Sequence, residues 1–344
     1  MNKLVSIITY SYNGESFIGR FLDSILNQSY NNIELIFIND GSSDKTEEIF
    51  LSYKPNFDNA GIKFKYFYQK NKGQAFSLNK GLKEVQGEYI TWPDSDDFLE
   101  YNSIEDRVDF LEKNAQYGFV RSDGYILKEN NLKNPTSYLS NKNKNRFKEH
   151  LFDDFINEHT YFAPGCYLTR TSAFIEINPN KTIYISKYSS SQNYQMLLPL
   201  ACKFKCGFID KPLLNYVHRD NSYSHSFVKK QNILERFKGH EDIIRNTIAQ
   251  LNINQEYYDK IINQKYLRKK LNLAKDFNDF RLFKETYNIL TKSGSSHLKD
   301  HILYMMTINK IFHFLMIKIK FIYIFLLDIY DRFSKIKLLK SRKN

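Results

Sequence analysis

Three aspartates fall within four positions of the stretch EYITWPDSDDFLE (Glu88 to Glu100), directly after an apolar segment. Carboxylates this close repel one another unless a cation or a positively charged partner joins them. The stretch is therefore either a turn of solvated acids or a metal site. Mg²⁺ and Mn²⁺ prefer such hard oxygen ligands and commonly bridge one or two carboxylates to diphosphate oxygens. Asp94 and Asp96 stand at alternate positions and can point the same way, whereas we expect Asp97 to face away, toward a helix N-terminus.

A further acid and a lysine-bearing loop suggest a nucleotide as the molecule beside such a metal. Asp40 ends the apolar run in FINDGSSD, where an acid can accept hydrogen bonds from a base or a ribose. The alternative role, a helix N-cap, is better filled by Ser42 or Asp44. The segment KNKGQAFSLNKGL brings Lys72 and Gly73 to a predicted helix N-terminus, which suits a phosphate. No GxxxxGK run occurs in the chain, which disfavours an ATPase.

The first hundred residues alternate between two periods. Short β-branched runs at 4–10, 32–40, 62–69 and 88–94 predict buried strands, and the segments between them predict helices. This order implies right-handed βαβ units and an α/β fold with a mostly parallel sheet flanked by helices. The polar clusters TYSYNGE, NDGSSD, QKNKGQ and DSDD follow the four strands. Because ligands bind at the carboxyl ends of parallel strands, the four clusters together predict a cleft.

The C-terminal third is basic and predicted to be helical. Of a formal net charge of +12, residues 226–344 hold 24 Lys and Arg against 11 Asp and Glu. No proline follows Pro212, and from there on only Gly239 and Gly294 interrupt the pattern. The stretch NKIFHFLMIKIKFIYIFLLDIYDRF has uncharged runs of at most seven residues, too short for a spanning helix of about 20. Its charges fall on one half of a helical wheel, which predicts a helix lying in a membrane interface; the alternative is packing on the protein's own core or a partner subunit.

The cysteines indicate the compartment. Cys166, Cys202 and Cys206 are an odd number without a zinc-ligand spacing, so we expect small buried residues in a reducing cytosol. The N-terminal MNKLVSIITYSYNGE is too short for a signal peptide and is predicted to be the first strand. The expected location is the cytoplasm, peripheral to the inner face of the cell membrane.

Several stretches resemble family 2 glycosyltransferases with the GT-A fold. They are VSIITYSYNGESFIGRFLDSILNQSYNNIELIFINDGSSDKT, NKGQAFSLNKGL and GEYITWPDSDD, and FIDKPLLNYVHRDNSYSH resembles the stretch that closes the acceptor side in many members. The likeness is close over the first hundred residues and looser to about residue 225. It implies a nucleotide-sugar-binding half over 1–100, an acceptor-binding half over 101–227 and a helical basic region over 228–344.

The resemblance also implies site residues and a reaction. The reaction is transfer of a sugar, with inversion, from a nucleoside diphosphate donor, with uridine as the expected base and Mn²⁺ or Mg²⁺ as cofactor. Asp96 is implied as metal ligand and catalytic residue, with Asp94 beside it. A histidine of the NYVHR region binds metal in some relatives, which makes His218 a candidate and His225 the second. The implied nucleotide-sugar contacts are Thr9, Tyr10, Asn13, Glu15, Asp40, Lys72, Gly73 and Asp94.

One departure from the family pattern concerns the general base. Relatives place a Glu-Asp pair before a helix that reads like YQMLLPLA, and here Gln192 and Asn193 stand there. A neutral amide cannot take a proton from an acceptor hydroxyl. Three explanations stay open: another acid such as Asp123 in VRSDGY reaches the site, the amides only hold sugar hydroxyls, or the protein is a poor catalyst. The first two are favoured.

The resemblance, together with the acidic cluster and the basic C-terminal stretch, thus implies a metal-dependent inverting transferase that acts on a glycan or lipid-linked oligosaccharide in surface-polysaccharide synthesis. A nucleotidyltransferase is disfavoured because TYSYNGE is acidic and lacks a Gly-rich basic loop. A catalytically weak or inactive sugar-nucleotide-binding protein is the alternative that Gln192 and Asn193 favour and DSDD opposes. Nucleic acid is not an expected partner, because the basic residues alternate with aliphatic ones without aromatic stacking motifs.

Overall fold

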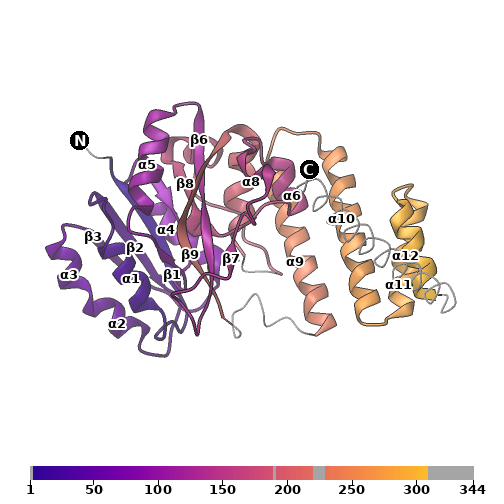
Figure 1. The fold of residues 1–344 in the computed structure, drawn as a ribbon, viewed down its shortest axis with the longest axis horizontal. Coiled ribbons are helices and arrows are strands. Elements are labelled where there is room, and N and C mark those ends of the chain that lie inside the picture. The colour runs from indigo at the N-terminus through magenta and orange to yellow at the C-terminus, as the bar shows by residue number, and fades with distance from the viewer. Residues whose placement is uncertain (1–2, 189–190, 220–228, 309–344) are drawn as a thin grey trace, which may run out of the picture. The chain divides into compact units, whose positions relative to one another are not determined.

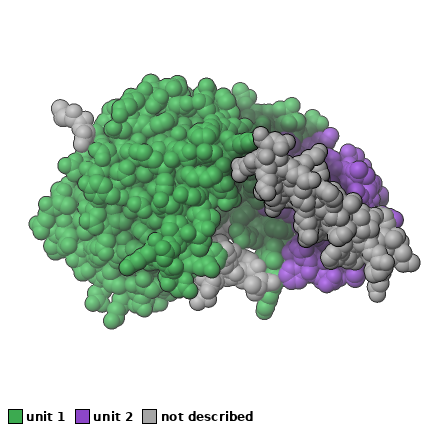
Figure 2. All heavy atoms as spheres, in the orientation of Figure 1, with its two compact units in different colours: residues 1–259 green, residues 260–344 purple. Residues whose placement is uncertain are grey.

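The computed structural model describes residues 3–188, 191–219 and 229–308. The chain divides into two compact units, residues 1–259 and 260–344 (Figure 2). The first unit holds the whole β-sheet, and α9 belongs to it as well (Figure 1). The division at residues 100 and 227 stays a prediction.

Unit 1 is built on one mixed sheet with the strand order β3-β2-β1-β4-β8-β6-β9-β5, and β7 pairs with β6. Strands β3, β2, β1 and β4 run parallel, as the alternation of strands and helices predicted. Strand β8 is antiparallel to both of its neighbours, and β6 and β9 are parallel to each other. The strands are β1 (Val5–Ser11), β2 (Ile33–Asn39), β3 (Lys63–Tyr68), β4 (Tyr89–Thr91), β5 (Phe98–Leu99), β6 (Tyr117–Lys128), β7 (Ser137–Tyr138), β8 (Tyr167–Arg170) and β9 (Lys205–His218).

Helices flank this sheet (Figure 1). The helices of unit 1 are α1 (Ile18–Leu26), α2 (Thr46–Ser52), α3 (Lys54–Asn59), α4 (Gln74–Lys83), α5 (Ser103–Lys113), α6 (Phe152–Asn157), α7 (Thr171–Ile177), α8 (Asn193–Lys203) and α9 (Lys230–Ile248). Within the described residues, three more follow: α10 (Gln255–Asp276), α11 (Phe280–Lys292) and α12 (Leu298–Ile308). The helical C-terminal region is therefore confirmed over the described residues 229–308. None of the described helices combines the length and apolar character that crossing a bilayer requires.

Close packing between α4 and the sheet brings the start of that helix to the strand ends. Helix α4 lies against β1 and β2, and a Cβ on Gly81 would come within 2.3 Å of Cγ2 of Ile8. Only glycine permits this approach without a shift of the Ile8 side chain or of the elements that carry it. The loop that precedes α4 is thereby held beside the carboxyl end of β2.

A buried acid on β2 ties three elements of the sheet together. Glu34 is fully buried, and its carboxylate lies 2.8 Å from the ammonium group of Lys65 on β3. It also accepts a hydrogen bond from the hydroxyl of Ser6 on β1. A second hydrogen bond comes from the backbone N–H of Gln86 at 2.7 Å. Burial alone would raise the pKa of Glu34, but the hydrogen bonds from Lys65 and Ser6 outweigh it, so the pKa lies below its ordinary value.

We expect Glu34→Gln to lower the free energy of unfolding by about 2 kcal/mol, because a fully buried carboxylate loses its charge-assisted hydrogen bonds, whereas Lys65 is partly exposed and can be solvated. The lowered pKa of Glu34 means that its contribution is present above the unfolded-state pKa and is lost as the pH falls through the folded-state value. Urea denaturation between pH 7 and pH 3 measures both effects. Asp58→Asn, which removes the exposed Lys54–Asp58 pair at 2.6 Å, is the control and should change stability by less than about 0.5 kcal/mol. Equal losses in the two variants would contradict the prediction.

Candidate active site

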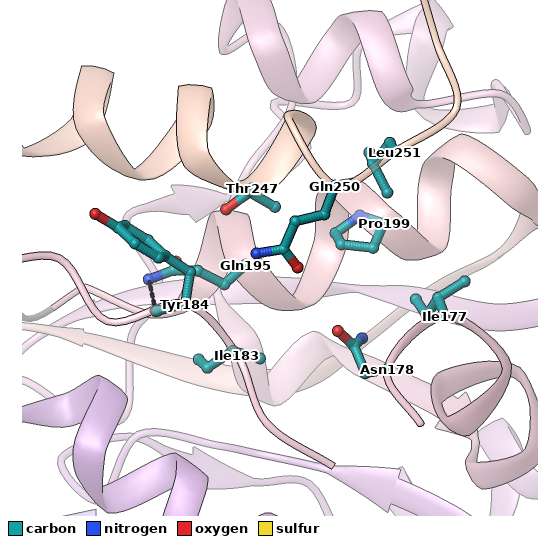
Figure 3. A pocket seen from close by; sticks show the side chains of 9 residues that line it. All are labelled: Ile177, Asn178, Ile183, Tyr184, Gln195, Pro199, Thr247, Gln250 and Leu251. Atoms are coloured by element: carbon teal, nitrogen blue, oxygen red, sulfur yellow. Dashed lines mark hydrogen bonds between the residues drawn. The ribbon is translucent and has the colours of Figure 1, made fainter. Parts of the chain in front are cut away.

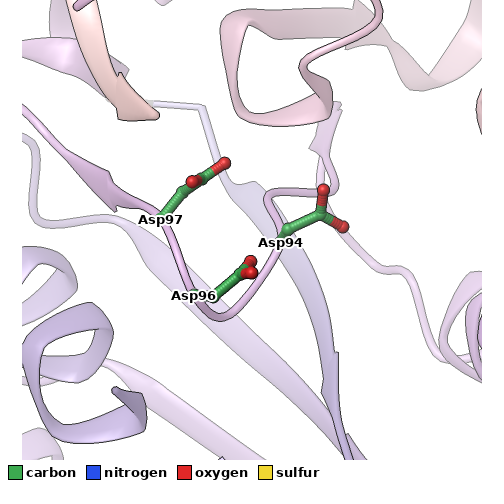
Figure 4. Close-up of side chains that lie close together, drawn as sticks. All are labelled: Asp94, Asp96 and Asp97. Atoms are coloured by element: carbon green, nitrogen blue, oxygen red, sulfur yellow. The ribbon is translucent and has the colours of Figure 1, made fainter. Parts of the chain in front are cut away.

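The three predicted acids meet in the turn between β4 and β5 (Figure 4). Asp94, Asp96 and Asp97 each offer a carboxylate oxygen, and these oxygens lie within 4.8 Å of one another. The expectation that Asp97 faces a helix N-terminus was wrong. Its Oδ1 accepts a hydrogen bond from the backbone N–H of Val217 on β9 at 2.9 Å, because β9 passes directly beside the turn.

The electrostatics of the turn favour a cation. Burial, followed by the charge of Asp96, raises the pKa of Asp94 to about 7. Burial, again with the neighbouring carboxylates, raises the pKa of Asp97 well above its ordinary range. Oδ2 of Asp97 is buried and has no hydrogen-bond partner among the described residues. Clustered, desolvated carboxylates with an unused oxygen fit Mg²⁺ or Mn²⁺, which bind through such ligands.

Strand β1 contributes the residues next to the turn. The hydroxyl of Thr9 donates to the carbonyl oxygen of Pro93 at 2.9 Å, and that of Tyr10 donates to Oδ1 of Asp94 at 3.0 Å. The amide of Gln192, at the start of α8, donates in turn to the hydroxyl of Tyr10. Burial and the charge of Asp94 raise the pKa of Tyr10 well above its ordinary value, so the phenol keeps its proton. The structure thus joins predicted donor-side and acceptor-side residues in one hydrogen-bonded chain.

Asn13 and Glu15 hold two loops together at the same edge of the sheet. Oδ1 of Asn13 accepts from the backbone N–H of Ser43 at 2.8 Å, and Oε2 of Glu15 accepts from that of Lys45 at 3.0 Å. Asn13 itself lies in the left-handed region, with φ of 52°. Both side chains therefore shape the loops after β1 and β2, and their contact with a nucleotide stays a prediction.

Asp40 organises the loop between β3 and α4. Its carboxylate accepts hydrogen bonds from the backbone N–H groups of Lys72 and Gly73 at 2.9 and 2.8 Å, and from the amide of Gln69 at 2.7 Å. The φ of Gly73 is 88°, a conformation that favours glycine, and α4 begins at the next residue. The structure brings Asp40, Lys72 and Gly73 together as expected. The hydrogen-bond donors to the Asp40 carboxylate come from the loop between β3 and α4.

Gln192 and Asn193 present two unused acceptor oxygens. The side-chain amide of Asn193 donates to the carbonyl oxygen of Phe162 at 2.9 Å. The side-chain amide of Gln192 donates to the hydroxyl of Tyr10. These donations fix the orientation of both amides. Oε1 of Gln192 and Oδ1 of Asn193 are buried and have no hydrogen-bond partner among the described residues. A hydroxyl group of a ligand is the kind of donor that such oxygens lack.

Asp123 is held in a different set of contacts. Its fully buried carboxylate accepts from the backbone N–H of Gly124 at 2.9 Å, from both the N–H and the hydroxyl of Ser140 at 3.0 and 2.7 Å, and lies 3.1 Å from the ammonium group of Lys142. These four donors engage both carboxylate oxygens in contacts within the fold. This arrangement argues against Asp123 as the relocated general base.

His218 ends β9, and its carbonyl oxygen accepts from the backbone N–H of Glu129 at 3.2 Å. It is not one of the three residues that form the acidic cluster, and its role as a metal ligand stays a prediction. His225 and the predicted amphipathic stretch from residue 309 onward lie outside the described residues.

Two arginines next to the acidic turn were missed by the sequence reasoning. Arg219 forms an ion pair with Asp96 through Nη2 and Oδ2, and Nη2 of Arg20 donates to the carbonyl oxygen of Asp96 at 2.6 Å. For Arg219, the adjoining His218 was a signal, since it placed this end of β9 near the metal. Nothing in the local pattern of α1 singles out Arg20.

A small cavity of about 30 Å³ lies elsewhere in unit 1, between α7, α8 and α9 (Figure 3). None of the predicted site residues lines it. Its lining residues are Ile177, Asn178, Ile183, Tyr184, Gln195, Pro199, Thr247, Gln250 and Leu251.

Comparison with known proteins agrees with this fold. The sequence model described as "Glycosyl transferase family 2" matches residues 6–177, half of the chain. An uncharacterized glycosyltransferase of Rickettsia conorii is 37% identical over 190 residues, which are 53% of this chain and 30% of the relative. One of Haemophilus influenzae is 38% identical over 151 residues, 42% of this chain and 59% of the relative. The chain thus spans about a third of the length of the Rickettsia relative.

Solved structures show the same fold. Residues 1–349 of S. aureus TarS superpose with a TM-score of 0.55 at 18% identity, covering 88% of this chain and 79% of that one. The mannosyltransferase PcManGT of Pyrobaculum calidifontis, in complex with GDP-Man and Mn²⁺, gives 0.54 at 12% identity, with 88% and 79% covered. The fold is therefore of the GT-A type, as the motifs predicted. The chain belongs to glycosyl transferase family 2.

Proposed function

We propose that this chain transfers a sugar, with inversion, from a nucleoside diphosphate sugar to a glycan or lipid-linked oligosaccharide of a surface polysaccharide. The observation that carries the proposal is the acidic turn, whose three carboxylate oxygens lie within 4.8 Å of one another beside Tyr10. Asp94 and Asp96 would hold a divalent metal, which would supply positive charge to a departing diphosphate. UDP is the favoured nucleotide, because TarS of the same fold has been solved with UDP-GlcNAc.

The residues of the chain divide the work of binding and orientation. The loops shaped by Asn13, Glu15 and Asp40 surround the proposed nucleotide site at the carboxyl ends of β1 and β2. The unused oxygens of Gln192 and Asn193 accept hydrogen bonds from hydroxyl groups of the acceptor sugar and so align it. A neutral amide holds a hydroxyl group but does not remove its proton.

The proposal is tested by measuring UDP or GDP release from a panel of sugar nucleotides with Mn²⁺, Mg²⁺ or EDTA. Slow metal-dependent release of UDP from one donor identifies that sugar and supports a transferase. Metal-dependent binding without turnover favours the second candidate, an inactive or weak sugar-nucleotide-binding protein, which the amides at positions 192 and 193 favour. Absence of binding to every donor contradicts both candidates.

We also propose a cytoplasmic protein that lies peripherally on the inner face of the membrane through its basic C-terminal stretch. Deleting residues 309–344 is expected to move most of the protein from the membrane fraction to the supernatant, because the stretch combines apolar residues with cations that bind anionic lipid. Flotation with vesicles that contain or lack anionic lipid measures the effect. An unchanged membrane fraction would rule out this stretch as the anchor.

A further inference from the structure

We infer that Arg219 competes with the divalent cation for Asp96 and thereby makes metal binding depend on the nucleotide. The inference rests on the proposed function. It assigns Arg219 as a positioning residue that acts through a carboxylate of the acidic turn.

The first step is the geometry of the ion pair. Nη2 of Arg219 contacts Oδ2 of Asp96, an oxygen of the residue expected to hold the metal. The side chains are 19% and 25% exposed, so water screens the pair only partly. The guanidinium also lies over the ring of Phe17, 4.4 Å from its centroid. This contact holds the positive charge beside the turn.

Arg20 approaches the same turn differently, which separates the two arginines. It donates to the backbone carbonyl oxygen of Asp96 and lies over the ring of Phe98, 5.3 Å from its centroid. A cation bound by the carboxylates would leave this backbone contact intact. Of these two arginines, Arg219 is the one that contacts a carboxylate oxygen of Asp96.

The charges of the turn give the direction of the effect. The ion pair places the positive charge of Arg219 on a carboxylate oxygen of Asp96. A divalent cation added alone must then displace or face the positive charge of Arg219. A nucleoside diphosphate adds negative charge, which compensates for the metal and both arginines together. Nε of Arg219 is buried and has no partner among the described residues, so the guanidinium has a donor left for an anionic group.

The test measures Mn²⁺ binding to the full chain by electron paramagnetic resonance of free Mn²⁺, without and with UDP. Arg219→Gln is expected to bind Mn²⁺ alone about tenfold more tightly than wild type, since about 1.4 kcal/mol of competition corresponds to that factor. The strengthening of Mn²⁺ binding by UDP should shrink by a similar factor. Arg219→Lys keeps a charge without the planar fork and should fall between the two.

Arg146→Gln is the matched control, because it removes an arginine that pairs with Asp210 at 3.0 Å. It should bind Mn²⁺ as wild type does. A purely structural role of Arg219 predicts weaker Mn²⁺ binding on substitution, so unchanged or weaker affinity in both Arg219 variants overturns the inference while wild-type binding upholds the proposed function. Absence of Mn²⁺ binding by wild type under both conditions overturns the proposed function and this inference with it.

Discussion

Asp96→Asn is expected to lower metal-dependent release of the nucleoside diphosphate by about 1,000-fold. A metal that stabilises the charge of a leaving group contributes several kcal/mol, and about 4 kcal/mol corresponds to this factor. The substitution keeps the size of the side chain and removes the charged ligand that lies within 4.8 Å of the neighbouring carboxylate oxygens. Initial rates with Mn²⁺ at saturating donor measure the loss.

Asp109→Asn is the control for this experiment. Asp109 is an exposed carboxylate on α5 that pairs with Lys113 at 3.1 Å, so its loss should leave the rate within about twofold. Adding EDTA to wild type should reproduce the loss seen in Asp96→Asn, and adding it to the variant should change little. A variant that keeps the wild-type rate would show that the acidic turn does not hold a catalytic metal.

The strands and loops that could be predicted are those that follow from the pattern of apolar and polar residues close together in the sequence. The apolar β-branched runs of β1 and β2 fixed their place as buried parallel strands, and the polar residues after them marked one edge of the sheet. Because the carboxyl ends of parallel strands share one edge of the sheet, Tyr10 and Asp94 lie together although 84 positions separate them. The predicted fourth strand ran to residue 94, whereas β4 ends at Thr91. The strand stops before Pro93 because proline lacks the N–H that strand pairing uses.

Contacts across long sequence distances explain what could not be predicted. The pairing of Arg219 with Asp96 spans 123 positions, and no periodicity or spacing encodes it. Asp123 stood out as an acid in a polar stretch, but its four donors come from its own neighbour and from the loop around residue 140. The sequence can identify an acidic residue as a candidate general base. Whether its carboxylate is accessible to a ligand depends on contacts that only the fold determines.

The double substitution Gln192→Glu with Asn193→Asp is expected to raise metal-dependent turnover by about 100-fold or more. General-base catalysis contributes about 100-fold to 10,000-fold, and the contacts of Asp123 with Ser140 and Lys142 argue against Asp123 as that base. The two amide oxygens are already buried and unpartnered among the described residues, so carboxylate oxygens would face the acceptor at the same places. Rates of sugar transfer and of donor hydrolysis, measured at several pH values, follow the gain.

Each exchange also removes a donor, which limits the gain. Gln192→Glu loses the hydrogen bond to Tyr10, and Asn193→Asp sets a carboxylate oxygen against the carbonyl oxygen of Phe162. The single variants therefore show which position tolerates the acid. Gln195→Glu, on the same helix with its amide bonded to the carbonyl oxygen of Ser191 at 2.6 Å, adds the same single charge as each single variant and is the control. Loss of activity in the double variant, with activity kept in the control, would contradict the prediction. It would show that the reaction requires the amides at positions 192 and 193 and uses no general base from α8.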